Sequence, residues 1–313
     1  MRVHFWGTRG SLPTALNAAQ VRGKIIGALK AARGRTLIDE EEIAAFVDRE
    51  LPFAIRGTYG GNSSCIEIRG GNGHVLCDAG TGLRDFGQTV NTSPGVYHLF
   101  LSHLHWDHLQ GFPFFTPAYI PGNHVRIYSF HPDMEGAFTT QQRPPFFPVP
   151  LAAMRAEISF HPLEEGETYE IAGFQVRGTK QHHPGDSYGY RFAKDGKSVV
   201  YSTDSEHKKD AENPHYPYLD FIRETDLLIF DAQYTLLDTI SDKENWGHSS
   251  NVVAVEMAVE GRVKRLCLFH HEHTYDDAMF DELLEDTRTY LRIHAETSRL
   301  EILLAYDGLE IEI

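Results

Sequence analysis

The chain has few cysteines and no long apolar run. Its three cysteines, Cys65, Cys77 and Cys267, are odd in number and form no CxxC pair, so they predict buried free thiols rather than a disulfide scaffold. No stretch reaches about 18 uncharged apolar residues, and the first residues carry no signal-peptide pattern. We therefore expect a cytoplasmic protein that neither spans nor binds a membrane.

Positive charge is also scarce, with 29 basic residues against 44 acidic ones and a formal net charge of −15. Such a chain repels long polyanions unless a local basic patch or a bound metal reverses the field. Long nucleic acid is therefore disfavoured as a partner, whereas a small anionic substrate at a metal site stays compatible. The 313 residues, 41% of them hydrophobic, can bury a sizeable core.

Histidine, by contrast, is abundant, and one hexapeptide concentrates it: His103-Leu104-His105-Trp106-Asp107-His108. Residues two apart on an extended segment point the same way, so the first two histidines can close on one ion. Asp107 and His108 can then address a second ion. Zinc accepts imidazole nitrogen and carboxylate oxygen, and manganese or iron tolerates the same donors. The hexapeptide therefore predicts a metal site without naming the metal.

The hydrophobic pattern predicts an α/β chain. Helical periodicity indicates helices at 18–32, 40–51, 249–259 and 276–296, the first two forming a helical hairpin. Asp39 and Glu42 are placed as a capping box, and Ser249 or Ser250 as an N-cap. Several candidate ligands directly follow predicted strands, where a rigid scaffold can converge distant side chains. The predicted strands are 3–6, 65–68, 75–77, 96–101, 125–130, 174–177, 188–192, 198–202, 227–230, 266–269 and 301–305.

The proline-rich stretch 141–150 is incompatible with an ordinary helix or a central strand, so we expect an extended surface segment there. Its aromatic side chains, with those of 111–115, either wall a pocket or close the core, and the core is the preferred interpretation.

Five separated motifs, taken in order, resemble the metallo-β-lactamase superfamily. The resemblance implies a four-layer αββα sandwich, built as a single domain over 1–313 with a helical-hairpin insertion at about 14–58. The motifs are Cys77-Asp78-Ala79-Gly80-Thr81-Gly82, the segment Ser102 to His108, His183-Pro184-Gly185, Tyr201-Ser202-Thr203-Asp204 and Leu268-Phe269-His270.

The resemblance also implies two divalent metal ions, with zinc expected and manganese or iron as alternatives. One ion would be held by His103, His105 and His183, the other by Asp107, His108 and His270, and Asp204 would bridge them. Carboxylates can bridge two cations, whereas a neutral imidazole nitrogen offers one lone pair.

Two ligand positions have a competing neighbour, because His182 adjoins His183 and His271 adjoins His270. Adjacent strand residues point to opposite faces, so one of each pair should ligate, and His183 and His270 are preferred. Asp78, in a glycine-rich turn, is expected to support a ligand rather than bind metal.

The resemblance implies hydrolysis by a metal-bridging hydroxide, with Asp107 also placed among the catalytic residues. His248, in Gly247-His248-Ser249, and Asp231 match elements of the phosphodiesterase branch, which includes RNase Z-type enzymes. There they would stabilise the scissile phosphate and assist the leaving alkoxide. The competing interpretation is that His248 caps a helix and Asp231 ends a strand.

The preferred substrate is a small or cyclic phosphodiester, because the whole-chain pattern is similar to bacterial small phosphodiesterases. The acidic balance and the lack of a Gly/Pro-rich basic arm argue against tRNA processing. Alternatives are an acyl hydrolase of the lactonase, thioesterase or β-lactamase type, a single-strand nuclease, and a non-catalytic binding protein. The stripe of Ile43, Phe46 and Val47 in the insertion must be buried somewhere, either as a lid or in a homodimer, and a homodimer is expected.

Overall fold

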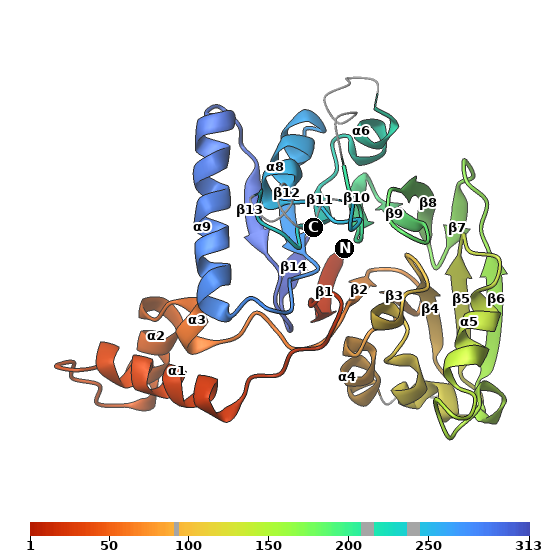
Figure 1. The fold of residues 1–313 in the computed structure, drawn as a ribbon, viewed down its shortest axis with the longest axis horizontal. Helices are drawn as coiled ribbons and strands as arrows, with labels where there is room; N and C mark the ends of the chain where they lie inside the picture. Colours follow the sequence, from red (N-terminus) through yellow and green to blue (C-terminus); the bar gives the residue numbers. More distant parts are fainter. Residues whose placement is uncertain (91–93, 208–215, 237–244) are drawn as a thin grey trace.

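The computed structural model describes residues 1–90, 94–207, 216–236 and 245–313, and its framework is two β-sheets packed face to face (Figure 1). The first sheet runs in the order β14 (Glu310–Glu312), β1 (Arg2–Gly7), β2 (Cys65–Arg69), β3 (His74–Cys77), β4 (Val96–Phe100), β5 (His124–Ser129) and β6 (Glu157–Pro162). The second runs β13 (Glu301–Leu304), β12 (Arg265–Phe269), β11 (Leu227–Asp231), β10 (Lys197–Ser202), β9 (Ser187–Lys194), β8 (Phe174–Gln181) and β7 (Tyr169–Ile171).

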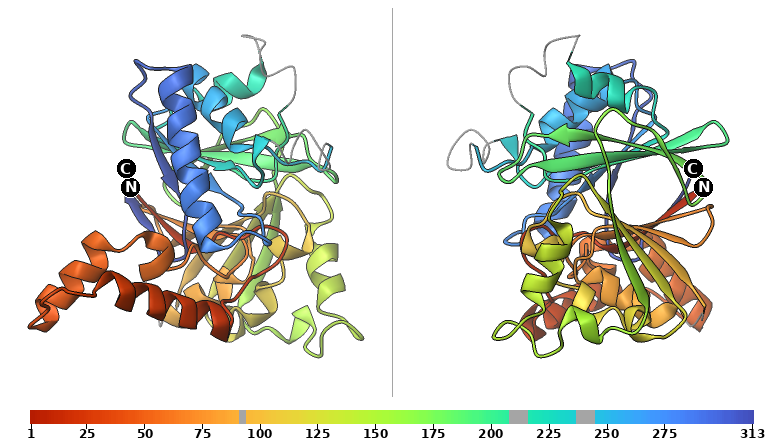
Figure 2. Two further views of the ribbon diagram at one scale, coloured as in Figure 1. Left: turned by 60° about the vertical axis from the view of Figure 1, so that its left-hand side comes forward. Right: turned by 90° about the vertical axis from the view of Figure 1, so that its right-hand side faces the viewer.

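Helices lie on the outer faces of the two sheets (Figure 2). Against the first sheet lie α4 (Gly82–Thr89), α5 (Met134–Gln141) and the short 3₁₀ turns Trp106–His108, Phe112–Phe114, Thr116–Tyr119 and Leu151–Ala153. Against the second lie α6 (Pro217–Ile222), α8 (Asn251–Glu260) and α9 (Asp277–His294).

Three apolar clusters separate these layers. One fills the space between the sheets, a second lies under α6, α8 and α9, and a third lies under α4 and α5. Strand β11 is buried along its whole length because both of its faces are covered, which explains its unbroken apolar run. The three cysteines are buried and free, as predicted.

The eleven predicted apolar runs all coincide with strands and overrun them by no more than one residue. The strands that the pattern missed, β6, β7 and β14, lie at sheet edges. Edge strands have less apolar surface to bury, so their sequences carry a weaker periodic signal.

Parallel pairing decides where polar side chains gather. Strands β3, β4 and β5 pair in parallel, and so do β10, β11, β12 and β13. The carboxyl ends of parallel strands meet at the same edge of a sheet, so the residues that follow them are brought together. Each candidate ligand follows one of these ends or that of β8.

A helical arm, residues 14–58, projects from one side of the sandwich (Figures 1 and 2). It contains α1 (Ala18–Ala31), α2 (Glu40–Glu50) and α3 (Phe53–Arg56), and the first two helices each end one residue before the predicted position. At its base Lys24 Nζ donates to Asp277 Oδ2 at 2.6 Å, and the backbone amide of Ala54 donates to Asp281 Oδ2 at 3.2 Å. These contacts attach the arm to α9.

The caps and the apolar stripe of the arm differ in part from the predictions. Asp39 accepts from the Glu42 amide, but the Glu42 side chain accepts from the Ile38 amide rather than from Asp39, so the predicted capping box is only half formed. In the stripe Phe46 is buried, whereas Val47 is half-buried and Ile43 is 47% exposed. The arm therefore buries only part of its apolar stripe within this chain.

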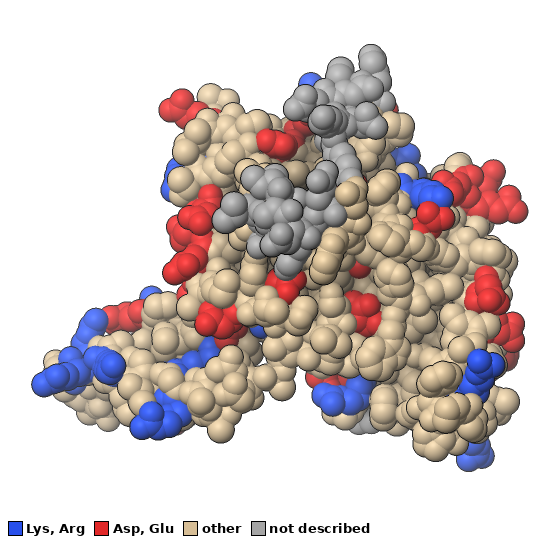
Figure 3. Space-filling model, in the orientation of Figure 1, with Lys and Arg blue, Asp and Glu red and all other residues tan. Residues whose placement is uncertain are grey.

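The arm also differs from the rest of the molecule in charge. Residues 18–38 contain no acidic residue and five basic ones: Arg22, Lys24, Lys30, Arg33 and Arg35. Figure 3 shows basic side chains gathered over the arm, while acidic side chains are prominent on the body.

Within the described residues no helix is long and apolar enough to cross a membrane.

Candidate metal centre

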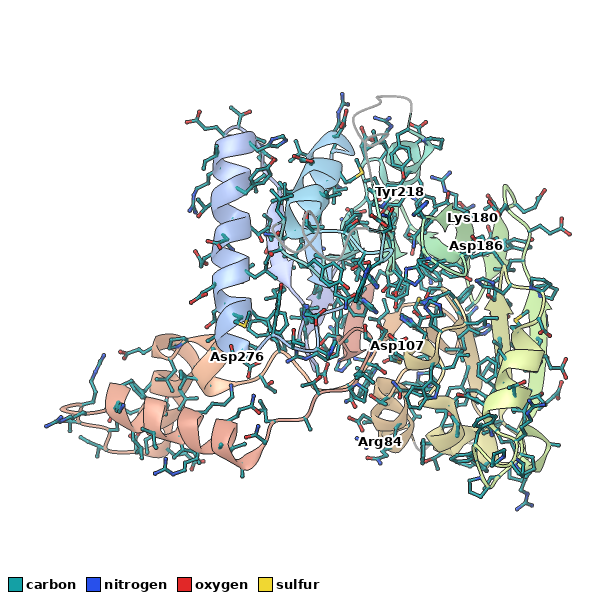
Figure 4. The ribbon with its side chains drawn as sticks, in the orientation of Figure 1. Arg84, Asp107, Lys180, Asp186, Tyr218 and Asp276 are labelled. Atoms are coloured by element: carbon teal, nitrogen blue, oxygen red, sulfur yellow. The ribbon has the colours of Figure 1, made fainter. Side chains whose placement is uncertain are left out.

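The predicted ligands converge from both sheets. The hexapeptide follows β4 in the first sheet, while His183, Asp204 and His270 follow β8, β10 and β12 in the second. Figure 4 places Asp107 in the middle of the molecule, between the two halves of the sandwich. The site is therefore assembled across the interface between the sheets.

Three histidines form one side of the cluster. The ligand atoms of His103, His105 and His183 all lie within 4.8 Å of one another. His183 Nε2 is 3.1 Å from His105 Nδ1, and both His103 Nε2 and His183 Nε2 lie 3.7 Å from Asp204 Oδ2. His105 is exposed while the other members are buried, so this side faces the solvent.

The other side combines Asp107, His108 and His270, whose ligand atoms also lie within 4.8 Å of one another. Asp107 Oδ2 is 3.2 Å from His108 Nε2 and 3.5 Å from His270 Nε2. The remaining oxygen of Asp204, Oδ1, lies 3.3 Å from His108 Nε2 and 3.2 Å from His270 Nε2. The two oxygens of Asp204 thus face different trios, which is the arrangement that a bridging carboxylate needs.

The donor set fits metal ions. Among the described residues, Nε2 of His103, His108 and His270 is buried without a hydrogen-bond partner, which is costly unless a cation takes the lone pair. Burial lowers the pKa of His103, His105 and His183, so these imidazoles are neutral. Neutral imidazoles beside carboxylates are the ligands that divalent transition metals prefer.

The two acidic ligands are held ionised. Burial opposes the charge of Asp107, but His108 and His270 outweigh it and hold its pKa well below the usual range. His270 and His108 act in the same way on Asp204 against its burial, and its pKa is also well below the usual range. The centre therefore presents two carboxylates to a cation.

Asp78 does not point at the cluster but supports it. Its Oδ2 accepts from His108 Nδ1, Ser102 Oγ and Tyr201 Oη, each at 2.7 Å, and its Oδ1 accepts from the Ser102 amide at 2.7 Å. The bond to Nδ1 fixes the tautomer of His108, so that Nε2 is turned toward the other ligands.

In each adjacent histidine pair the structure brings one member into the cluster. His183 donates from Nδ1 to the Gly247 carbonyl at 2.9 Å and turns Nε2 inward, whereas His182 is exposed. His271 is buried but donates from Nε2 to the Ala305 carbonyl at 2.7 Å, away from the cluster, while His270 joins it.

His248 and Asp231 form a pair beside the cluster. His248 Nδ1 lies 2.9 Å from Asp231 Oδ2, and the amides of Ser205 and Gln233 donate to the two oxygens of Asp231 at 2.9 and 3.1 Å. The His248 ring lies 5.0 Å from that of His183 and 5.1 Å from that of His270, measured between centroids. Burial disfavours the charged imidazole, but Asp231 outweighs it and raises the pKa of His248 above its ordinary value.

Three supporting residues were not predicted from the sequence. The Ser11 amide donates to Asp107 Oδ2 at 2.9 Å, and Ser102 and Tyr201 donate to Asp78. A Cβ at Gly10 would lie 2.5 Å from His270 Nδ1, so that turn requires glycine. Ser102 and Tyr201 stand in two of the quoted motifs, but no role was predicted for them, because these contacts join residues distant in sequence.

The backbone at three strand ends is in the left-handed region. Asp78, Asp204 and His270 have φ of 61°, 48° and 61°, a conformation that non-glycine residues rarely adopt. Such outliers persist where the surrounding structure imposes them, and they concentrate at functional sites. Here each follows a strand within two residues and turns a side chain into or beside the cluster.

Comparison with known proteins gives one family. A model described as a beta-lactamase superfamily domain matches residues 74–271. Ribonuclease Z from Oceanobacillus iheyensis is 23% identical, over 62% of this chain and 76% of that protein.

Solved structures share the fold. The metallo-beta-lactamase fold protein YhfI from Bacillus subtilis superposes with a TM-score of 0.65, 19% identity and 99% coverage of both chains. A diphosphatase from the PhnP family superposes with a TM-score of 0.62 and 18% identity, over 100% of this chain and 97% of the other. The predicted four-layer αββα sandwich and the predicted resemblance are confirmed.

Proposed function

The chain belongs to the beta-lactamase superfamily and is a metal-dependent hydrolase, and from this premise we propose that it cleaves phosphodiester bonds, preferentially in small or cyclic nucleotides. The observation that carries the proposal is the hydrogen-bonded pair of His248 and Asp231 beside the cluster. Hydrolysis of an alkyl phosphodiester must expel an alkoxide, which is a strong base and needs a proton donor. Hydrolysis of a thioester, one of the acyl alternatives, expels a thiolate, which is a much weaker base and has no such requirement.

The seven predicted residues would hold two divalent ions, one in each trio, with Asp204 shared, and zinc is the expected metal. Ions held there supply positive charge that activates water and stabilises the charge developing on the phosphoryl oxygens. The carboxylates of Asp107 and Asp204 would attract the two metal ions. Because the charge of two dications exceeds that of two carboxylates, the loaded centre would still attract an anionic diester.

His248 is placed to donate the proton. Asp231 accepts a hydrogen bond from Nδ1 of His248. The proton on Nε2 is therefore the one that the imidazolium can deliver to the leaving oxygen. Backbone donors from Ser205 and Gln233 hold Asp231 in turn, so the imidazole has a fixed direction. A positioned acid of this kind contributes about 10²–10⁴ in rate.

The names of the similar proteins are compatible with this bond type. A ribonuclease and a diphosphatase both act at phosphorus, and this chain resembles one in sequence and the other in fold. The net charge of −15 favours a substrate with few negative charges over a long polyanion.

The test is turnover of bis(p-nitrophenyl) phosphate and of 2′,3′- and 3′,5′-cyclic nucleotides by metal-quantified protein, with a lactone and a thioester as acyl substrates. Asp107→Ala removes a metal ligand, and His248→Ala removes the proton donor and spares the ligands. We expect two metals per chain and turnover of every phosphodiester that Asp107→Ala reduces. His248→Ala should reduce turnover of the cyclic nucleotides, which expel an alkoxide, more than that of bis(p-nitrophenyl) phosphate, which expels a weakly basic nitrophenolate. Acyl turnover that His248→Ala leaves unchanged, without phosphodiester turnover, would move the assignment to an acyl hydrolase.

A second candidate, cleavage of single-stranded RNA, is favoured by one observation. Five of the seven basic residues of the arm are gathered in 18–38, which fits the name of a relative, ribonuclease Z. RNA held by the arm would bind more weakly with rising salt, and Lys30→Ala with Arg33→Ala would reduce the slope of that dependence. Salt-independent turnover of cyclic nucleotides, unaffected by these substitutions, would exclude the arm from substrate binding.

A further inference from the structure

A largely apolar cavity of about 730 Å³ lies beside the hexapeptide, on the side of the loop where Leu104 and Trp106 project. We call it the aromatic pocket. Its opposite wall is made by α5 and by the proline-rich segment that follows it. The principal lining residues are Leu104, Trp106, Phe114, Ala137, Phe146 and Phe147.

The aromatic side chains of the pocket are exposed to an unusual degree. Trp106, Phe114 and Phe146 are 64%, 56% and 67% exposed, and the rings of Phe114 and Phe147 meet edge to face at 5.5 Å. By contrast Phe112, from the same aromatic motif as Phe114, is completely buried. The two aromatic segments therefore divide between core and pocket, and concentrated exposed apolar surface of this kind marks a binding site.

The charge of the pocket selects what enters it. None of the described residues that line it is basic, and its one charged member is the carboxylate of Asp133. A phosphate would be repelled there, whereas a neutral planar ring would stack on the aromatic side chains. The pocket and the metal centre are thus complementary to opposite ends of one molecule.

The pocket also borders the loop that carries four of the predicted ligands, although none of the ligands lines it. Trp106 lies between His105 and Asp107, and consecutive Cα atoms are about 3.8 Å apart. His105 and Trp106 are both exposed, so one ligand can reach the cluster and the pocket from the solvent at neighbouring residues of this loop. Binding at one can therefore position a group at the other.

We propose that the aromatic pocket binds the nucleobase, or an equivalent aromatic ring, of a substrate whose phosphodiester lies at the metal centre. The assignment of the ring to the substrate rests on the proposed function. Leu104 and Trp106 then form the wall nearest the reacting group, and Phe146 is a specificity-determining residue that does not touch the metal ligands.

The first experiment measures ring binding without any chemistry. Adenosine, which carries no phosphate, is titrated into the metal-loaded protein while the indole N–H resonances of its three tryptophans are followed by NMR. Trp106→Phe assigns the Trp106 signal, and ribose serves as the ligand without a ring. We expect a saturable shift of the Trp106 signal with adenosine and none with ribose.

Phe146→Ala is the diagnostic variant, because Phe146 is exposed and its truncation leaves the core intact. Loss of one stacking partner should weaken adenosine binding by about 5- to 100-fold. Ile293→Ala, 79% exposed on α9, is the matched control and should change nothing. An adenosine affinity equal in wild type and Phe146→Ala, or no shift of Trp106, would overturn the proposal.

Turnover separates this proposal from the proposed function. If both hold, Phe146→Ala raises KM for a cyclic nucleotide and leaves kcat near the wild-type value, because the ring is bound and not transformed. Adenosine binding that depends on Phe146, in a protein without phosphodiester turnover, would retain the pocket as a ring-binding site and reject the bond assignment. Phosphodiester turnover with a KM that Phe146→Ala does not alter would retain the bond assignment and reject the pocket.

Discussion

In the metal cluster, six of the seven predicted ligands are buried and aim their polar atoms at one another, whereas in α1 no residue is buried at all. The cluster takes side chains from both sheets, while the arm is built from one continuous stretch of chain. A contact network that spans the sandwich makes every member sensitive to substitution. A solvated helix tolerates change, because little packs against it.

The largest effect is expected at Asp204, which faces both trios. Asp204→Ala removes the shared carboxylate and leaves the trio of His103, His105 and His183 without a carboxylate, while Asp107 stays in the other trio. We expect a loss of bound metal and of turnover greater than the 10–100-fold typical of a supporting residue. Metal analysis and kcat/KM measure the effect, with Asp286→Ala on the exposed face of α9 as the control. Full metal content in Asp204→Ala would contradict the bridging role.

The next effect is expected at His248, which adjoins the cluster without belonging to either trio. His248→Ala should lower kcat by about 10²–10⁴ and leave both metals bound.

The pH profile provides a second test of His248. The pKa of His248 is raised, so the acid form persists above the pH at which an ordinary imidazole loses its proton. Activity that needs this proton is present below the raised pKa and is lost as pH rises through it. We expect an alkaline fall of kcat in the wild type and its absence in His248→Gln. An alkaline limb that persists unchanged in the variant would assign the fall to another group.

A smaller effect is expected at Asp78, one step outside the cluster. Asp78→Asn keeps the size of the side chain but weakens its acceptance from His108, Ser102 and Tyr201. Metal affinity should fall by about 10–100-fold, with a smaller change in turnover at saturating metal. Competition with a chelator measures the affinity, and an affinity equal to that of the wild type would make Asp78 purely structural.

The smallest effect is expected in the arm. Leu29 is 67% exposed, so Leu29→Ser should change the free energy of unfolding by less than about 0.5 kcal/mol. Phe46, the buried residue of α2, is the comparison within the same arm, and Phe46→Ala should cost more. Urea denaturation of both variants measures the difference. A large loss at Leu29 would show that α1 is covered by another molecule in solution.

The same contrast explains how much of the molecule could be predicted from sequence. The ligands of the hexapeptide could be predicted because they stand within six consecutive residues. Strands β6, β7 and β14 were not predicted, because they are edge strands whose periodic signal is weak. His183, Asp204 and His270 were identified because each stands in a motif that resembles the metallo-β-lactamase superfamily. Ser11, Ser102 and Tyr201 were missed, because their contacts depend on how the two sheets come together and ordinary residue types carry no signal for that.

The arm illustrates the opposite difficulty. Its helices were predicted to within one residue at their ends, since capping and periodicity are local properties. The burial of its apolar stripe could not be predicted, because burial depends on which surface packs against the stripe. Ile43 is largely exposed, and homodimer formation and a cytoplasmic location stay predictions.

The placement of the ligands on both sheets has a consequence for folding. Four ligands belong to the first sheet and three to the second, so ions bound between them act as a staple across the sandwich. A ligand that binds only the native state stabilises it by mass action, by about 2.7 kcal/mol when its free concentration is 100 times Kd. The melting temperature should therefore rise with the free metal concentration, so that the melting temperature reports metal supply.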